Sequence, residues 1–139
     1  MSEVFAVVDK ISNLEITADD HALLTLKLKN DALAQISFDL NARYTFCKIE
    51  ATGENGTAIW DRVDHSIKIF DSNEKKWSEE QFTKDDFLEM YPNQTKHYLE
   101  CLKNKTTPLI DINDALKTQL IIDKCFESSS KKKMVKIEN

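Results

Sequence analysis

The sequence predicts an α+β domain, in which a two-layer, open-faced and mostly antiparallel sheet carries two helices on one face. Two observations support this fold class. Residues 20–62 alternate apolar and polar side chains in steps of two, which is typical of strands with one buried face. Residues 83–130 change to helical spacing, so that strands come first and helices follow. A chain of 139 residues has the length of a single domain, here 1–139.

Turn-forming residues divide the strand region. Asn30 and Asp31 interrupt the alternation, and both residue types tolerate left-handed backbone conformations. The only two glycines, Gly53 and Gly56, lie together in a second turn and predict a hairpin. Trp77 falls in a charged segment that we expect to be a loop. Strands are expected over residues 4–11, 22–28, 32–40, 44–52, 57–62 and 66–70.

Two helices follow the strands. Thr83 and Asp86 form a weak capping box, and Pro92 indicates that the first long helix begins near residue 91. Asp111 caps the second helix, because Asp114 follows three residues later. A short edge strand is expected over residues 134–137. The expected apolar stripes are Phe87, Met90, Gln94, Tyr98 and Leu102 on the first helix, and Ile112, Ala115, Leu116, Gln119, Ile122 and Phe126 on the second.

Composition limits the classes of partner. The net charge of −5 argues against nucleic acid, because phosphate binding requires a basic surface. No apolar run approaches the length of a membrane span, and no signal peptide precedes the first strand. Three cysteines without close spacing favour free structural thiols in a reducing compartment. We therefore expect a cytoplasmic protein that binds neither membrane nor nucleic acid.

The sequence offers no catalytic, metal or cofactor motif. Two glycines confined to one turn exclude a GxGxxG loop or a P-loop, so no cofactor is expected to bind this chain. His21, His65 and His97 are far apart in sequence, and ordinary structural histidines explain them. One corner differs: Asn41, Arg43 and Tyr44 end a strand with an amide, a guanidinium and a phenol. Such groups suit hydroxyl or carboxylate ligands, although a structural salt bridge also explains the arginine.

The uncovered side of the sheet predicts association. Two helices can cover only the side of Leu24, Leu26, Ile36 and Phe38. The opposite side keeps large apolar groups among polar ones: Leu23, Thr25, Lys27, Leu33, Gln35 and Ser37. An exposed face of this kind is typical of a sheet-to-sheet homo-oligomer, and simple solvation is the alternative.

Several stretches resemble one enzyme family. Residues 53–61 (GENGTAIWD) are similar to a hairpin of the glucose–fructose oxidoreductase/inositol dehydrogenase/rhizopine-catabolism (Gfo/Idh/MocA) family. Residues 90–102 (MYPNQTKHYLECL) resemble a helix that follows in that family. Pro108, residues 111–116 and residues 122–129 are similar to what comes after this helix in the family. The likeness covers nearly the whole chain in the same order, but only the second part of the family's C-terminal domain.

The resemblance implies a substrate-facing and oligomerising sheet domain. Family members also carry a Rossmann domain for NAD or NADP and a catalytic lysine, and neither segment is found here, so no catalytic or cofactor residue is assigned. Asn41, Arg43 and Tyr44 are the substrate-side candidates from their position at a sheet end. We expect part of a sugar or cyclitol oxidoreductase that is inactive alone and partners its missing Rossmann domain. The alternative is a stand-alone interaction module that binds a protein or small ligand through its exposed sheet.

Overall fold

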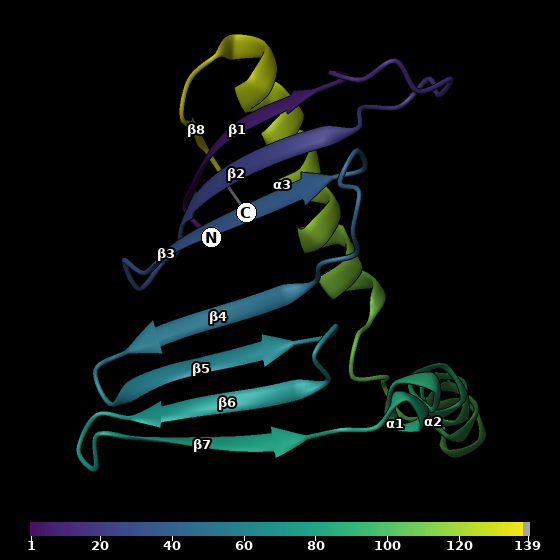
Figure 1. The fold of residues 1–139 in the computed structure, drawn as a ribbon. Coiled ribbons are helices and arrows are strands. Elements are labelled where there is room, and N and C mark those ends of the chain that lie inside the picture. The colour runs from purple at the N-terminus through teal and green to yellow at the C-terminus, as the bar shows by residue number, and fades with distance from the viewer. Residues whose placement is uncertain (138–139) are drawn as a thin grey trace. The chain divides into compact units, whose positions relative to one another are not determined.

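The chain forms two compact units in the computed structural model, which describes residues 1–137 apart from the side chain of Phe87. Unit 1 contains Met1–Arg43 and the segment from Leu109 onward, and unit 2 contains Tyr44–Pro108. Each unit has its own antiparallel four-stranded sheet (Figure 1). The α+β class and the open-faced layout are confirmed. The sequence predicted one sheet, whereas the structure has two.

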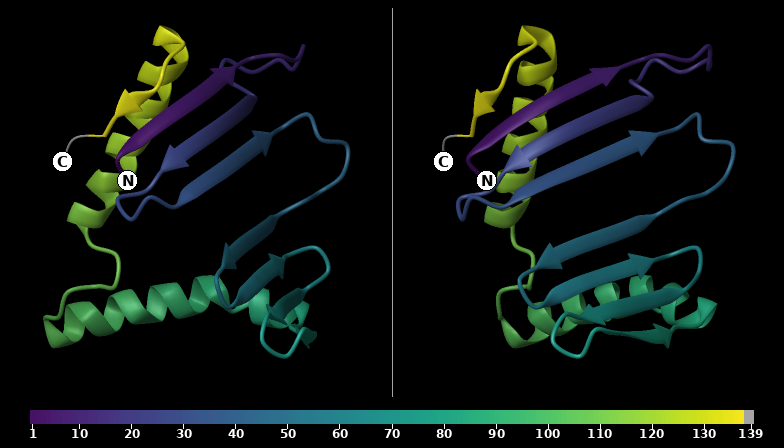
Figure 2. Two further views of the ribbon diagram at one scale, coloured as in Figure 1. Left: turned by 90° about the vertical axis from the view of Figure 1, so that its left-hand side faces the viewer. Right: turned by 60° about the vertical axis from the view of Figure 1, so that its left-hand side comes forward.

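Sheet 1, in unit 1, has the strand order β3-β2-β1-β8. Its strands are β1 (Glu3–Asp9), β2 (His21–Lys27), β3 (Leu33–Asp39) and β8 (Val135–Lys136). The predicted turn is present, with Asp31 at a φ of 63° and its N–H bonded to the Leu28 carbonyl at 3.1 Å. The predicted C-terminal edge strand is confirmed as β8, which pairs with the start of β1. Helix α3 (Ile112–Lys131) covers one face of this sheet, as both views of Figure 2 show.

The apolar core of the protein lies between α3 and sheet 1. Val4, Ala6 and Leu26 are at most 1% exposed, and Cys125 and Ile137 complete the cluster. Leu24 and Ala34 pack against it, so the predicted inner face of β2 and β3 is correct near the turn. Farther along β3, Ile36 and Phe38 remain exposed.

The apolar stripe predicted for α3 was assigned to the wrong side of the helix. Its large members are exposed and turn away from the core: Ile112, Leu116, Ile122 and Phe126. Leu120, Ile121 and Cys125 pack on the core instead, and two serines of the same helix reach the edge of β1. The Ser128 hydroxyl accepts a hydrogen bond from Ala6 N–H at 2.9 Å, and Ser129 accepts one from Val8 N–H at 2.9 Å. β8 pairs with β1 only at Glu3 and Val4, so these serines occupy the part of the β1 edge that β8 leaves open.

Sheet 2, in unit 2, has the strand order β4-β5-β6-β7. Its strands are β4 (Lys48–Gly53), β5 (Gly56–Asp61), β6 (Ser66–Asp71) and β7 (Lys76–Gln81). Gly56 fits its turn because a side chain there would meet the Phe70 carbonyl at 1.9 Å. One face of the sheet is mostly apolar yet largely exposed, with Ile49, Ala51, Ala58, Trp60, Ile67 and Ile69.

Two sequence expectations for this sheet were wrong. The strand that was predicted to begin at residue 44 begins at Lys48. Lys48 pairs with Asp61, the last residue of β5, so the pairing of the two strands starts there. After Asp61 the chain turns, and the Asp61 carboxylate accepts a hydrogen bond from Val63 N–H at 2.9 Å in that turn. Trp77 lies in β7 instead of a loop, since its ring packs on Phe70 across the sheet with centroids 5.3 Å apart.

The helices of unit 2 begin where the sequence predicts. Helix α1 (Lys84–Leu88) is a separate short turn capped by Thr83 and Asp86, and α2 (Met90–Asn104) follows and packs on it. Lys105 ends α2 in the left-handed conformation. The expected stripe of α2 is exposed at Met90, Tyr98 and Leu102, whereas Cys101 is buried. Of the other two expected members, Gln94 is exposed and Phe87 lies outside the described side chains.

Candidate functional site

Polar side chains gather at one end of sheet 1, where β2 begins and β3 ends. His21 pairs in register with Asp39 on β3 and with Asp9 on β1. The three residues therefore form a row across neighbouring strands. Because side chains alternate along a strand, and Ala22 shares the helix-facing side with Leu24, this row belongs to the open face.

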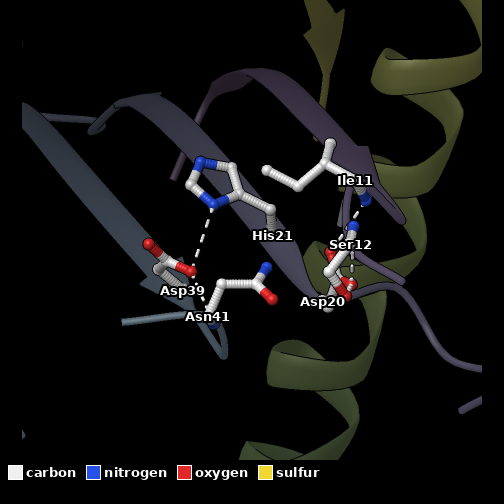
Figure 3. A network of polar contacts seen from close by, with 6 residues as sticks. All are labelled: Ile11, Ser12, Asp20, His21, Asp39 and Asn41. Carbon is white, nitrogen blue, oxygen red and sulfur yellow. Dashed lines mark hydrogen bonds and ion pairs between the residues drawn. The ribbon is translucent and has the colours of Figure 1, made fainter. Parts of the chain in front are cut away.

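His21 and Asp39 lie close together without closing a hydrogen bond. His21 Nδ1 is 3.8 Å from Asp39 Oδ1, and each side chain keeps about a quarter to a third of its surface exposed, 24% and 31%. Asp39 Oδ1 accepts the backbone N–H of Asn41 at 2.7 Å. Among the described residues, His21 Nδ1 and the Asn41 side-chain nitrogen are buried polar atoms without a hydrogen-bond partner. Figure 3 shows the Asn41 and Asp39 side chains on the same side of the imidazole ring.

Asp20, which precedes His21, fixes the backbone next to this cluster through hydrogen bonds. It is 2% exposed, and its carboxylate accepts the Ser12 hydroxyl as well as the N–H groups of Ile11 at 2.8 Å and Ser12 at 3.1 Å (Figure 3). The bond from the Ser12 hydroxyl, followed by those from the backbone, lowers the pKa of Asp20 below its ordinary value. The Asp20 carbonyl in turn accepts Leu40 N–H at 2.9 Å. Asp20 thus ties the loop after β1 to the end of β3.

The predicted substrate-side residues fall at the junction of the two units in sequence. Asn41 and Arg43 are at the end of the first segment of unit 1, and Tyr44 begins unit 2. Arg43 is exposed, and among the ion pairs of residues 1–137 none includes it, so the alternative of a structural salt bridge is not met. The Tyr44 side chain is exposed and its ring lies 5.8 Å from that of Phe46.

The described residues contain neither a glycine-rich phosphate loop nor a cluster of three metal-ligating side chains. Gly53 and Gly56 both serve the β4–β5 turn, so no glycine-rich loop remains to cradle a pyrophosphate. Within residues 1–137, no three histidine, cysteine or acidic side chains gather into a metal site. The three cysteines are free thiols, of which Cys101 and Cys125 are buried, and burial raises the pKa of Cys125. No described helix is long and apolar enough to span a membrane.

Comparison with known proteins identifies the domain. The model of the oxidoreductase family, C-terminal alpha/beta domain (Gfo/Idh/MocA), matches residues 2–137. The chain belongs to this family. A search of curated proteins gives no match. The resemblance seen in the sequence is confirmed.

Solved structures show the same fold at low sequence identity. Levoglucosan dehydrogenase in complex with NADH and levoglucosan has a TM-score of 0.85 and 13% identity, over 99% of this chain and 45% of that one. An Agrobacterium radiobacter oxidoreductase with NAD+, L-tartaric acid and magnesium gives 0.82 and 16%, over 98% and 43%. The WlbA dehydrogenase of Bordetella pertussis with NADH and UDP-GlcNAcA gives 0.76 and 17%, over 99% and 42%. This Gfo/Idh/MocA domain spans less than half the length of these proteins.

Sequence reasoning treated His21 and Asp39 separately and missed their pairing. The signal was available, because the turn at Asn30–Asp31 sets the register: counting outward from it, position 21 faces position 39. The register does not give the distance between the two side chains. It also does not show that His21 Nδ1 and the Asn41 side-chain nitrogen are buried without partners.

Proposed function

We propose that this Gfo/Idh/MocA domain is the substrate-side and oligomerisation part of an NAD(P)-dependent sugar or cyclitol oxidoreductase, and that it is not active alone. Its family membership is the observation that carries the proposal. The cofactor, NAD or NADP, belongs to a Rossmann domain outside this chain, since the described residues offer no phosphate-binding loop. The complete protein would transfer a hydride between the nicotinamide and a carbon that bears a hydroxyl group.

Asn41, Arg43 and Tyr44 are the residues that we propose on the substrate side. Arg43 and Tyr44 are exposed and without a described ion pair or hydrogen bond, so their polar groups are available to a ligand. A guanidinium and a phenol can both donate to hydroxyl or carboxylate oxygens. The proteins of similar fold are described with levoglucosan, L-tartaric acid and UDP-GlcNAcA, all of which carry such groups.

Substrate-side contact can be tested on the 139-residue chain by two-dimensional NMR. We expect levoglucosan to shift the amide resonances of Asn41, Arg43 and Tyr44, and the double change Arg43→Ala and Tyr44→Ala to weaken these shifts. Lys29→Ala, an exposed change at the opposite end of sheet 1, is the matched control. Shifts confined to other residues would contradict the assignment. NADH fluorescence titration should give no tight binding, and tight binding would contradict the role of this chain.

The open face of sheet 1 is the proposed oligomer interface. Phe5, Val7, Leu23 and Leu33 share this face and are 37–74% exposed, although each is a large apolar side chain. Water-exposed apolar area of this kind favours association, because burying it releases about 25 cal/mol per Å². A second copy of the same face could satisfy it in a symmetric contact.

Light scattering tests this interface. We expect the chain to be larger than a monomer at micromolar concentration, and Val7→Lys with Leu23→Lys to make it monomeric. Leu116→Lys places the same charge on an exposed apolar position of α3 and should leave the mass unchanged. A strict monomer for the unmodified chain would contradict the interface and would favour the open face as a binding surface for another partner.

A further inference from the structure

The row of Asp9, His21 and Asp39 suggests a ligand-contacting role that the sequence did not indicate. We propose that His21, oriented by Asp39, accepts a hydrogen bond from a hydroxyl group of an uncharged ligand at the end of the open face. The inference rests on the proposed substrate-side function and adds His21 to the same end of sheet 1 as Asn41. Asp39 would be a positioning residue and would not touch the ligand.

The position of Asp39 decides which ring nitrogen carries the proton. A neutral imidazole has one N–H donor and one acceptor nitrogen, and an ionised carboxylate only accepts. With Asp39 Oδ1 3.8 Å from Nδ1, the favourable tautomer places the hydrogen on Nδ1, toward the carboxylate. Nε2 is then left with a free lone pair. No hydrogen bond between described residues engages Nε2, and a quarter of the side chain remains exposed.

Asp39 is held in place for this task. Its Oδ1 accepts Asn41 N–H at 2.7 Å, while Leu40 N–H bonds to the Asp20 carbonyl. The backbone that carries Asp39 is therefore fixed. A small movement of the His21 ring would shorten the 3.8 Å between Nδ1 and Asp39 Oδ1 to hydrogen-bond length. Such contacts are often long without ligand and tighten in the complex.

The unsatisfied atoms distinguish this cluster from an ordinary structural pair. Buried polar groups in folded proteins nearly always have partners, because a buried donor or acceptor left without a hydrogen bond is destabilising. Here His21 Nδ1 and the Asn41 side-chain nitrogen both lack one. A purely structural histidine–carboxylate pair would close its own hydrogen bond. Because both atoms are buried, the ligand would not contact them. Nδ1 gains its partner when the ring closes on Asp39, which leaves Nε2 for the ligand.

Charge selects the class of ligand. Asp9 and Asp39 pair with His21 on the two neighbouring strands, so two carboxylates lie in the same row of the open face. A ligand carboxylate would be repelled there, whereas a hydroxyl group can donate its proton to Nε2 without adding charge. We therefore expect levoglucosan to engage His21 and L-tartrate not to do so.

Imidazole ¹⁵N NMR at pH 8 tests the tautomer without any ligand. Free neutral histidine prefers hydrogen on Nε2, so hydrogen on Nδ1 of His21 in the 139-residue chain would support the inference. Asp39→Ala should return His21 to the ordinary Nε2–H form, and Asp39→Asn, which keeps an acceptor oxygen and the side-chain volume, should preserve Nδ1–H. His65, in a turn of unit 2, is the internal control. An Nε2–H tautomer of His21 in the unmodified chain would overturn the inference.

Titration with levoglucosan, followed by NMR, tests the ligand contact. We expect His21→Ala and Asp39→Ala to weaken binding roughly 10-fold, as loss of an orienting group does at comparable sites, and His65→Gln to leave it unchanged. If the double change at Arg43 and Tyr44 weakens binding but the His21 and Asp39 variants do not, this inference fails and the proposed function stands. If none of these variants alters binding, or the unmodified chain binds no levoglucosan, both fail. Preference for L-tartrate would also overturn the inference.

Discussion

Units 1 and 2 have sheets of the same size but bury them very differently. In unit 1, α3 covers sheet 1, and the described core residues Val4, Ala6, Leu26 and Cys125 lie between them. Among the described apolar residues of unit 2, Cys101 alone is buried, and it lies on helix α2. On the apolar face of sheet 2, the side chain of Ile49 is 62% exposed and that of Ile69 is 50% exposed.

This difference indicates how each unit is stabilised. Unit 1 has a helix-covered core, and burial of apolar area is the main favourable contribution to folding. Unit 2 relies on its ladder hydrogen bonds, on its turns and on the Phe70–Trp77 ring contact. An exposed apolar face gains little stability until something covers it. We therefore expect unit 1 to be the more stable of the two.

The largest expected effect comes from removing a core side chain of unit 1. Leu26→Ala should lower the free energy of unfolding by about 2–5 kcal/mol, because it creates a cavity at a position 1% exposed. Ile69→Ala, the matched change in sheet 2, should cost about 1 kcal/mol or less. Urea unfolding followed by circular dichroism measures both.

Tryptophan fluorescence sharpens this test, because both tryptophans, Trp60 and Trp77, lie in unit 2. If the units differ in stability, the fluorescence transition should occur at lower urea than the circular dichroism transition. Coincident transitions, or equal losses for Leu26→Ala and Ile69→Ala, would refute the contrast between the units.

The next effect concerns the serines by which α3 meets β1. Ser128→Ala should cost about 1–3 kcal/mol, because it leaves the buried N–H of Ala6 without its acceptor. Ser130→Ala changes an exposed residue of the same helix and should be nearly neutral. Native-state hydrogen exchange should show faster exchange at Ala6 in the Ser128 variant. Unchanged exchange there would show that the hydroxyl does not protect the strand edge.

A smaller effect is expected at the start of α3. The Asp111 carboxylate accepts Asp114 N–H at 3.0 Å, so Asp111→Ala should destabilise the protein by about 1 kcal/mol. Asp111→Asn keeps an acceptor oxygen and should recover most of this loss. Thermal unfolding of the two variants compares them directly. Equal destabilisation by both changes would show that charge, and not the capping hydrogen bond, matters.

The smallest effect depends on pH. Hydrogen bonds from Lys124 and Lys131 lower the pKa of Glu127 from 4.5 to about 2. Because the folded-state value is the lower one, the stabilisation is complete above the ordinary value and is lost as pH falls toward 2. Glu127→Gln should therefore reduce stability at neutral pH but make little difference near pH 2, as thermal unfolding at both values can measure. A difference independent of pH would contradict this origin.

Local chemistry in the sequence predicted the boundaries of most elements. Asn30–Asp31 and Asp111 act on their own backbone neighbours, so their turn and cap could be inferred before any tertiary contact was known. The candidate site was predicted only in part. Asn41 was found from its position at a strand end, whereas the approach of His21 to Asp39 depends on pairing across strands.

The sequence by itself determined the α+β class, the strand-then-helix order, the family and the absence of a glycine-rich nucleotide loop, because each depends on residue type and spacing along the chain. Tertiary structure decided which side of α3 is buried. Ser128 and Ser129 meet the sheet, while Leu116 and Phe126 stay exposed. Periodicity identifies an apolar side but not its partner. The buried side of α3 combines Leu120 and Ile121, which pack on the core, with serines that accept the free N–H groups of the β1 edge.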